Sequence, residues 1–111
     1  GYIQTLRFDG KLPNLEKMGK SISLRTESLL AKQVVEIWYR VNNQGDFIYY
    51  DEFSGNDDFN GIYKSFDFPF RFFEVEFKIY LKTENTPPTL ISFEMLYDEK
   101  SEFQIDTTYS A

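Results

Sequence analysis

The sequence predicts an all-β fold, an antiparallel two-sheet β-sandwich that is jelly-roll-like and has about seven or eight strands. Apolar and polar side chains alternate along several short segments, turn residues separate these segments, and no long helical pattern lies between them. The 111 residues include 12 Phe, 8 Tyr and 1 Trp, enough aromatic surface to fill much of a core between two sheets. Closure into a barrel stays open, because alternation identifies the inward face of a strand but not its neighbours.

The clearest predicted strand runs from Phe72 to Thr83. The residues expected to face the core are Phe73, Val75, Phe77, Ile79 and Leu81. The residues between them, expected to face solvent, are Glu74, Glu76, Lys78, Tyr80 and Lys82. An alternation of this kind predicts a strand with one buried face in an antiparallel sheet.

A second strand is predicted from Gln33 to Val41, with Val35, Ile37, Tyr39 and Val41 on its inward face. It ends at the turn sequence Asn42-Asn43-Gln44-Gly45, which predicts a hairpin with Asp46–Tyr50 as the returning strand.

The remaining predicted strands are less regular. Ile91, Phe93, Met95 and Tyr97 alternate with polar residues after Pro87-Pro88 and predict a third long strand. Tyr2–Phe8 and Lys20–Thr26 predict two weaker strands, the latter with Ile22 and Leu24 facing inward. The longest irregular stretch is expected at Asp51–Pro69, as a loop held down by its aromatic residues.

The chain is expected to form one sandwich domain over residues 1–98, and residues 99–111 are either an edge strand or a linker to a following domain. It starts at Gly1, with neither an initiator Met nor a signal-peptide pattern, so we expect the natural chain to continue on at least one side.

Composition argues against several partners. The formal charge of −6 disfavours nonspecific contacts with phosphates, so nucleic acid is not an expected partner. No run approaches the roughly 20 apolar residues needed to cross a bilayer, so no membrane partner is expected either.

The residue types present do not predict an enzyme. The chain has no His and no Cys, which excludes the common nucleophile and base arrangements and the preferred zinc ligands. It also has no glycine-rich phosphate loop, and we expect no cofactor.

Carboxylates are the remaining candidates for acid and base chemistry, as in glycoside hydrolases. They are Asp51, Glu52, Asp57, Asp58, Glu74 and Glu76. We interpret Glu74 and Glu76 as solvated surface groups, without burial or a charged neighbour to shift a pKa. Residues 51–58 carry oxygen ligands suited to calcium but lack EF-hand spacing, and a solvated acidic turn is the preferred interpretation.

Three aromatic residues are the candidates for a ligand or partner surface: Trp38, Tyr49 and Tyr80. If they face solvent on an outer sheet surface, they can stack on sugars or contact a neighbouring subunit or domain. The protein contact, or packing under a loop, is the favoured interpretation.

The sequence contains a series of short motifs whose order along the chain is informative. The N-terminal half contains Gly1-Tyr2-Ile3-Gln4-Thr5, Phe8-Asp9, Leu12-Pro13, Lys17 and Ile37-Trp38-Tyr39-Arg40-Val41. The C-terminal half contains Phe77-Lys78-Ile79-Tyr80-Leu81-Lys82-Thr83, Pro88-Thr89-Leu90 and Phe93-Glu94-Met95-Leu96-Tyr97. This order resembles a β-sandwich module of tailed-bacteriophage virion proteins, including tail, baseplate and fibre components. The resemblance spans residues 1 to about 98, and the chain departs from it in residues 51–69 and in the tail from Glu99.

The resemblance implies a structural role without catalysis and supplies no site residues. The function expected is therefore a non-catalytic assembly module of a phage tail, baseplate or fibre protein, made in the bacterial host cytoplasm and located in the virion. Its expected partners are other virion chains or neighbouring domains, with a homo-oligomer and a host glycan as further candidates. The alternative is a carbohydrate-binding module of a phage adhesin or of a secreted glycan-degrading enzyme.

Overall fold

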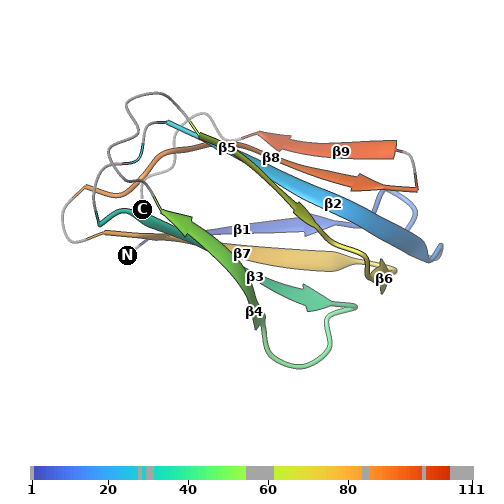
Figure 1. Ribbon diagram of the computed structural model, residues 1–111. Coiled ribbons are helices and arrows are strands. Elements are labelled where there is room, and N and C mark those ends of the chain that lie inside the picture. Colours follow the sequence, from blue (N-terminus) through green and yellow to red (C-terminus); the bar gives the residue numbers. More distant parts are fainter. Residues whose placement is uncertain are drawn as a thin grey trace.

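The computed structural model describes residues 2–27, 29, 32–54, 62–83 and 86–98, and the backbone of residues 100–105. This part of the chain contains nine strands and no helix (Figure 1). They are β1 (Tyr2–Phe8), β2 (Lys17–Thr26), β3 (Val34–Val41), β4 (Ile48–Ser54), β5 (Ile62–Asp67), β6 (Arg71–Phe72), β7 (Val75–Lys82), β8 (Leu90–Tyr97) and β9 (Lys100–Ile105). Among the residues described, no helix is long and apolar enough to span a membrane.

The strands form two sheets that pack face to face (Figure 1). One sheet has the order β1-β7-β3-β4, and the other has the order β5-β2-β8-β9 with β6 paired to β2. Every described pairing is antiparallel. The predicted antiparallel two-sheet β-sandwich is therefore confirmed.

The chain passes repeatedly from one sheet to the other. It changes sheet between β1 and β2 and again between β2 and β3, and β7 later enters the first sheet between β1 and β3. These crossovers differ from a simple meander, in which consecutive strands are neighbours in one sheet. Among the nine described strands, only β3–β4 and β8–β9 are consecutive strands that pair with each other as hairpins.

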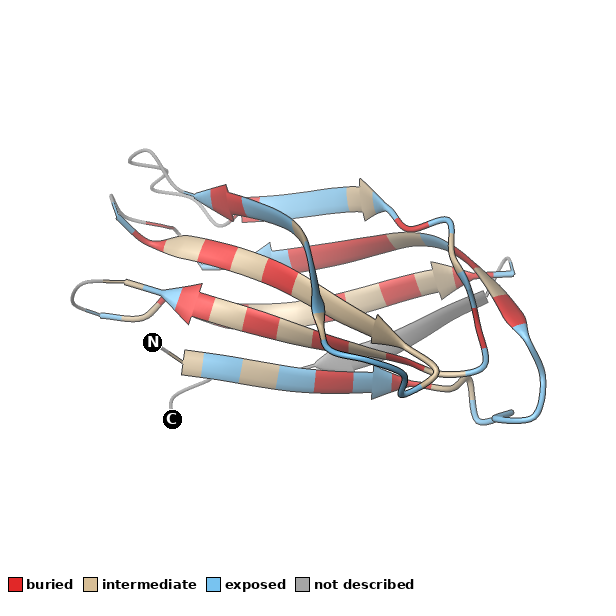
Figure 2. Cartoon of the chain, turned by 90° about the horizontal axis from the view of Figure 1, so that it is seen from below, coloured by how far each residue is buried: buried red, intermediate tan, exposed pale blue. Residues whose placement is uncertain are grey.

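The core lies between the sheets and is built from the alternation along each strand, visible as bands of buried residues in Figure 2. On β7 the four inward residues Val75, Phe77, Ile79 and Leu81 are all fully buried. Phe77 also reaches the facing sheet, where its ring centroid lies 4.9 Å from that of Phe93. Aromatic contacts of this kind fill the space between two sheets with few side chains.

One predicted strand is divided in two. Phe72 is fully buried and belongs to β6, whereas Phe73 is 41% exposed, so the prediction that Phe73 faces the core is wrong. The cause is the passage of the chain from one sheet to the other between Phe72 and Val75. The side-chain oxygen of Asn42 accepts the backbone N–H groups of Phe73 and Glu74 there and stabilises the crossing.

The predicted loop Asp51–Pro69 is wrong at both of its ends. β4 continues to Ser54 and β5 occupies Ile62–Asp67, and residues 55–61 lie outside the described part of the chain. Both strands lie at sheet edges and are largely exposed, so their alternation is weak in the sequence. Pairing with neighbouring strands fixes the position of both segments, since Phe53 lies opposite Val35 and Phe66 lies opposite Ile22.

Two further boundaries differ from the prediction. β2 begins at Lys17, earlier than the predicted Lys20, because its first residues pair with β6. In β8 a register shift buries Leu90, where Ile91 was expected to be the first inward residue. The backbone of β9 pairs with β8 at the edge of its sheet, and residues 106–111 lie outside the described part.

Candidate functional site

The outer face of the β1-β7-β3-β4 sheet carries a row of apolar and aromatic side chains, which we call the outer stripe. It consists of Ile3 on β1, Tyr80 on β7, Trp38 on β3 and Tyr49 on β4. Strand register explains the row, because Ile3 lies opposite Tyr80 and Trp38 lies opposite Tyr49. The structure thus brings the three candidate aromatic residues together on one surface.

The three rings of the outer stripe meet at steep angles. The centroid of Trp38 lies 5.5 Å from that of Tyr49 with the planes at 81°, and 5.8 Å from that of Tyr80 with the planes at 59°. The Trp38–Tyr49 contact is edge-to-face, a favourable geometry for aromatic pairs, and the Trp38–Tyr80 contact is tilted. They do not make a coplanar platform, so the stripe is not a flat surface for stacking along an extended chain of sugars.

Trp38 is oriented by the carboxylate next to it on the same strand. Its indole N–H donates to Oε1 of Glu36 at 3.1 Å, and the other oxygen of Glu36 accepts from Nζ of Lys82 at 2.9 Å. The hydrogen bond from Lys82 lowers the pKa of Glu36, and the bond from Trp38 acts in the same direction. Glu36 is therefore an anchor that holds the Trp38 ring in one position.

Tyr49 is held in a similar way at the sheet edge. Its hydroxyl donates to Oε1 of Glu52 at 2.8 Å, and this bond, followed by desolvation, raises the pKa of Tyr49 to about 12. The ring remains 43% exposed. Tyr49 thus presents a neutral, oriented aromatic surface to solvent.

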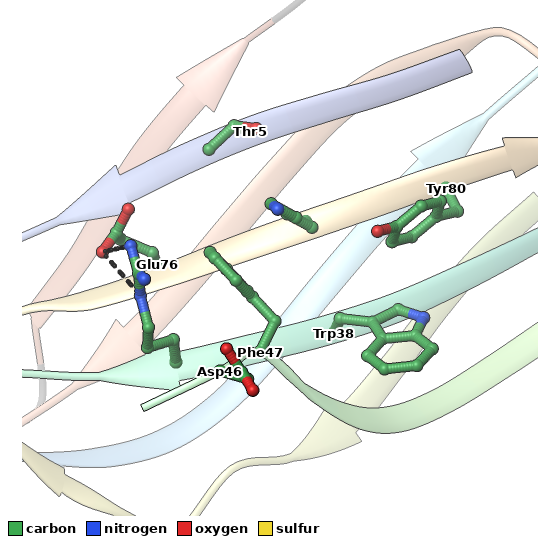
Figure 3. A pocket seen from close by; sticks show the side chains of 8 residues that line it. Thr5, Trp38, Asp46, Phe47, Glu76 and Tyr80 are labelled. Carbon is green, nitrogen blue, oxygen red and sulfur yellow. Dashed lines mark hydrogen bonds and ion pairs between the residues drawn. The ribbon is translucent and has the colours of Figure 1, made fainter. Parts of the chain in front are cut away.

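A shallow hollow of about 450 Å³ lies beside the outer stripe (Figure 3). Its lining includes Thr5, Trp38, Asp46, Phe47, Glu76 and Tyr80. Asp46 and Phe47 belong to the β3–β4 connection, which turns back across the sheet at Asn42 and Asn43. The hollow therefore combines residues from three strands and one hairpin loop.

Two basic side chains complete the lining, Arg40 and Lys78. Arg40 donates to Oε1 of Glu76 through Nε at 3.2 Å and Nη2 at 2.9 Å, and this pair is drawn with dashed lines in Figure 3. Both basic groups also lie over the Phe47 ring, with the Arg40 Cζ 4.5 Å and the Lys78 Nζ 4.3 Å from its centroid. Cation–π contact holds Phe47 against the sheet.

Two of the candidate carboxylates, Glu74 and Glu76, form ion pairs with basic side chains. Glu76 is bound to Arg40 and Glu74 to Arg7, so the prediction that they lack charged neighbours is wrong. Cross-strand register brings these opposite charges together, and sequence spacing does not reveal it.

The acidic residues of the proposed calcium loop are only partly described. Oδ1 of Asp51 accepts the backbone N–H of Glu52 at 2.7 Å, and Asp57 and Asp58 lie outside the described residues. Within the described residues, no group of three or more metal-ligating side chains comes together.

Sequence reasoning missed part of this site. Ile3, Asp46 and Phe47 were not candidates, although an aromatic residue directly after the polar turn Asn42–Gly45 was a usable signal. Arg40 and Lys78 were recognisable as outward residues of their strands. Their meeting over Phe47 depends on the fold of the loop.

Comparison with protein families, with curated proteins and with solved structures gives no match to this chain. The outer stripe and the hollow are therefore interpreted from their own geometry.

Proposed function

We propose that this chain is a non-catalytic assembly module that contacts other protein chains or neighbouring domains through the outer stripe. The observation that carries the proposal is the continuity of the stripe, which has a member on each of the four strands of one sheet face. Ile3 and Tyr49, at the two ends of the stripe, are 41% and 43% exposed. Large apolar side chains gathered on one exposed face are typical of a contact surface.

The rigidity of the stripe supports the same proposal. Glu36 orients Trp38, and Glu52 orients Tyr49, so the aromatic rings lose little conformational freedom when a partner covers them. Aromatic residues held in this way are the usual energetic centres of protein interfaces.

Three carboxylates on this face are engaged in ion pairs, which favours a binding role over a catalytic one. Glu36, Glu74 and Glu76 are each bonded to a basic side chain. A general acid or base needs a carboxylate that is available to the substrate and has a pKa tuned to the reaction. Ion pairs across the strands instead stiffen a surface on which aromatic contacts are made.

The setting we propose is the virion of a tailed bacteriophage, in a tail, baseplate or fibre protein. This part of the proposal rests on the motif order from Gly1 to Tyr97. A symmetric particle component repeats the same face many times, and a repeated weak contact is then sufficient for assembly.

The test is site-specific photocrosslinking in the particle that contains this chain. A photoreactive phenylalanine analogue is placed at Tyr49 of the stripe or, as a matched control, at Tyr63. Tyr63 is also an exposed tyrosine on an edge strand, but it belongs to the other sheet. We expect protein crosslinks from position 49 and not from position 63. Crosslinking in equal yield from both positions, or none from position 49, contradicts the proposal.

A further inference from the structure

We propose that the hollow beside the outer stripe is a binding site for a neutral saccharide. This inference goes beyond the proposed function, because it assigns a small ligand to a hollow that shares Trp38 and Tyr80 with the stripe and adds polar residues beside it. Its central residues are Asp46, Lys78 and Tyr80, none of which the assembly proposal requires to contact a protein partner through its polar atoms.

The polar groups of the hollow are only partly used within the protein. Arg40 and Glu76 are bonded to each other. The carboxylate of Asp46 and the hydroxyls of Thr5 and Tyr80 make no hydrogen bond or ion pair with another described residue. Figure 3 shows the Tyr80 hydroxyl pointing toward the middle of the lining group.

Lys78 adds donors to this set. Its only described side-chain interaction is the contact of Nζ with the Phe47 ring, which leaves its N–H groups available. The hollow therefore offers a carboxylate acceptor, an ammonium donor and two hydroxyls within one half-open space. Neighbouring hydroxyl groups on a pyranose ring need this mixture, since each hydroxyl both donates and accepts.

Aromatic walls supply the apolar part of the recognition. Trp38 and Tyr80 line one side, and Phe47 stands between them and Glu76 in Figure 3. A pyranose ring presents C–H groups on its faces, which pack on an aromatic face while the hydroxyls point outward. The volume of about 450 Å³ falls within the range of roughly 300–1,000 Å³ usual for small-ligand sites.

The charge of the lining selects a neutral ligand. The lining has two cations, Arg40 and Lys78, and two anions, Asp46 and Glu76, and their formal charges cancel. A cationic ligand is disfavoured because Arg40 and Lys78 already occupy the Phe47 ring. An anionic sugar has to approach Asp46, whose carboxylate has no described cationic partner.

Trp38 makes the test direct, since it is the only tryptophan of the chain and lines the hollow. The probes are cellobiose, maltose, lactose and N,N′-diacetylchitobiose, each titrated into the protein while Trp38 fluorescence is recorded. We expect saturable changes with at least one probe, with a dissociation constant of about 0.1–10 mM as befits an open site. Glucuronic acid and glucosamine, as charged sugars, are expected to bind more weakly than glucose.

The variant Asp46→Asn is expected to raise the dissociation constant of the tightest-binding probe by about tenfold, because a charged hydrogen-bond acceptor is lost. The control Asp67→Asn changes an exposed carboxylate on the other sheet and is expected to leave binding unchanged. Flat titrations with all four disaccharides, equal effects of the two variants, or tighter binding of a charged sugar than of glucose overturn the inference.

The two proposals fail separately. Loss of crosslinks from Tyr49 contradicts the protein contact and says nothing about the hollow, which Tyr49 does not line. Loss of sugar binding in Asp46→Asn, with crosslinks from position 49 retained, supports a saccharide site that depends on Asp46 and not on the protein contact at Tyr49.

Discussion

At the start of β2, the ammonium group of Lys17 lies among three backbone carbonyls. Nζ donates to Leu12 O at 2.9 Å, to Leu15 O at 2.5 Å and to Phe73 O at 2.9 Å, and the side chain is only 2% exposed. A buried charge is costly unless hydrogen bonds compensate it, and here all three donors are used. Lys17 thereby ties the loop after β1 to the crossing before β7.

Replacement of Lys17 is expected to destabilise the fold. The variant Lys17→Met leaves three carbonyls without their donor and is expected to lower the free energy of unfolding by about 2–4 kcal/mol. The control Lys20→Met removes an exposed lysine from the same strand and is expected to change it by less than about 0.5 kcal/mol. Urea unfolding followed by Trp38 fluorescence gives both values. Equal values for the two variants contradict the role assigned to Lys17.

Tyr49 gives a prediction about pH. Its pKa of about 12 in the folded chain lies above the ordinary tyrosine value of about 10, so folding stabilises its neutral form. This contribution to stability is fully present below about pH 10 and is lost as the pH rises toward 12.

The cause assigned to this shift can be tested with Glu52→Gln. The variant removes the charged acceptor of the Tyr49 hydroxyl, and the pKa of Tyr49 is expected to fall toward about 10. An NMR titration of the labelled Tyr49 ring measures the pKa directly. Glu94→Gln, on the other sheet, is the control and is expected to leave it unchanged. A Tyr49 pKa that stays near 12 in Glu52→Gln assigns the shift to other groups.

The β3–β4 hairpin contacts both the outer sheet face, through Asp46 and Phe47, and the β6–β7 crossing, through Asn42. Its turn residues Asn42 and Asn43 have φ of 56° and 53°, a region that asparagine tolerates better than most residues. Only Asn42 also bonds to the β6–β7 crossing, through Oδ1 to Phe73 and Glu74 and through its N–H to Glu74 O at 2.8 Å. The turn therefore has both a local and a long-range function.

Alanine substitutions separate the two functions of the turn. Asn42→Ala and Asn43→Ala share the cost of a left-handed backbone, but only the first removes the acceptor of two backbone N–H groups. We expect Asn42→Ala to be the less stable by about 1–2 kcal/mol. Thermal and urea unfolding of the two variants provide the comparison, and equal stability argues that water replaces Asn42 at the crossing.

At the scale of the molecule, stability depends on aromatic contacts that join the two sheets. Phe77 of β7 contacts Phe8 on its own sheet at 5.8 Å between ring centroids, and Phe68 and Phe93 at 5.2 Å and 4.9 Å. Phe93 belongs to β8 of the facing sheet. Removal of the Phe77 ring opens the core where the layers meet.

The variant Phe77→Ala is expected to lose about 3–5 kcal/mol of stability, the usual cost of removing a buried phenylalanine ring. Phe73→Ala is the matched control, since this ring is 41% exposed at the crossing and its removal is expected to cost less than about 1 kcal/mol. Denaturant unfolding measures both. If Phe73→Ala proves as costly as Phe77→Ala, Phe73 contributes to the core.

Much of the sandwich was predictable, because burial on one face leaves a period of two in the sequence. Val75, Phe77 and Ile79 were assigned to the core correctly on that ground. The pattern failed at Phe73, where the chain changes sheet, and along β4 and β5, where exposed edge strands have little alternation. The period-two alternation of side chains identifies the buried face of a strand within a sheet, but it does not indicate where the chain leaves that sheet.

The alternation of side chains, the turn at Asn42–Gly45 and the supply of aromatic residues determined an antiparallel sandwich, because these are local properties of consecutive residues. Tertiary structure alone decided that Ile3, Tyr80, Trp38 and Tyr49 form one row and that Phe47 lies under two cations beside them. Register between strands and the path of a loop set those contacts, and both depend on residues far apart in the chain.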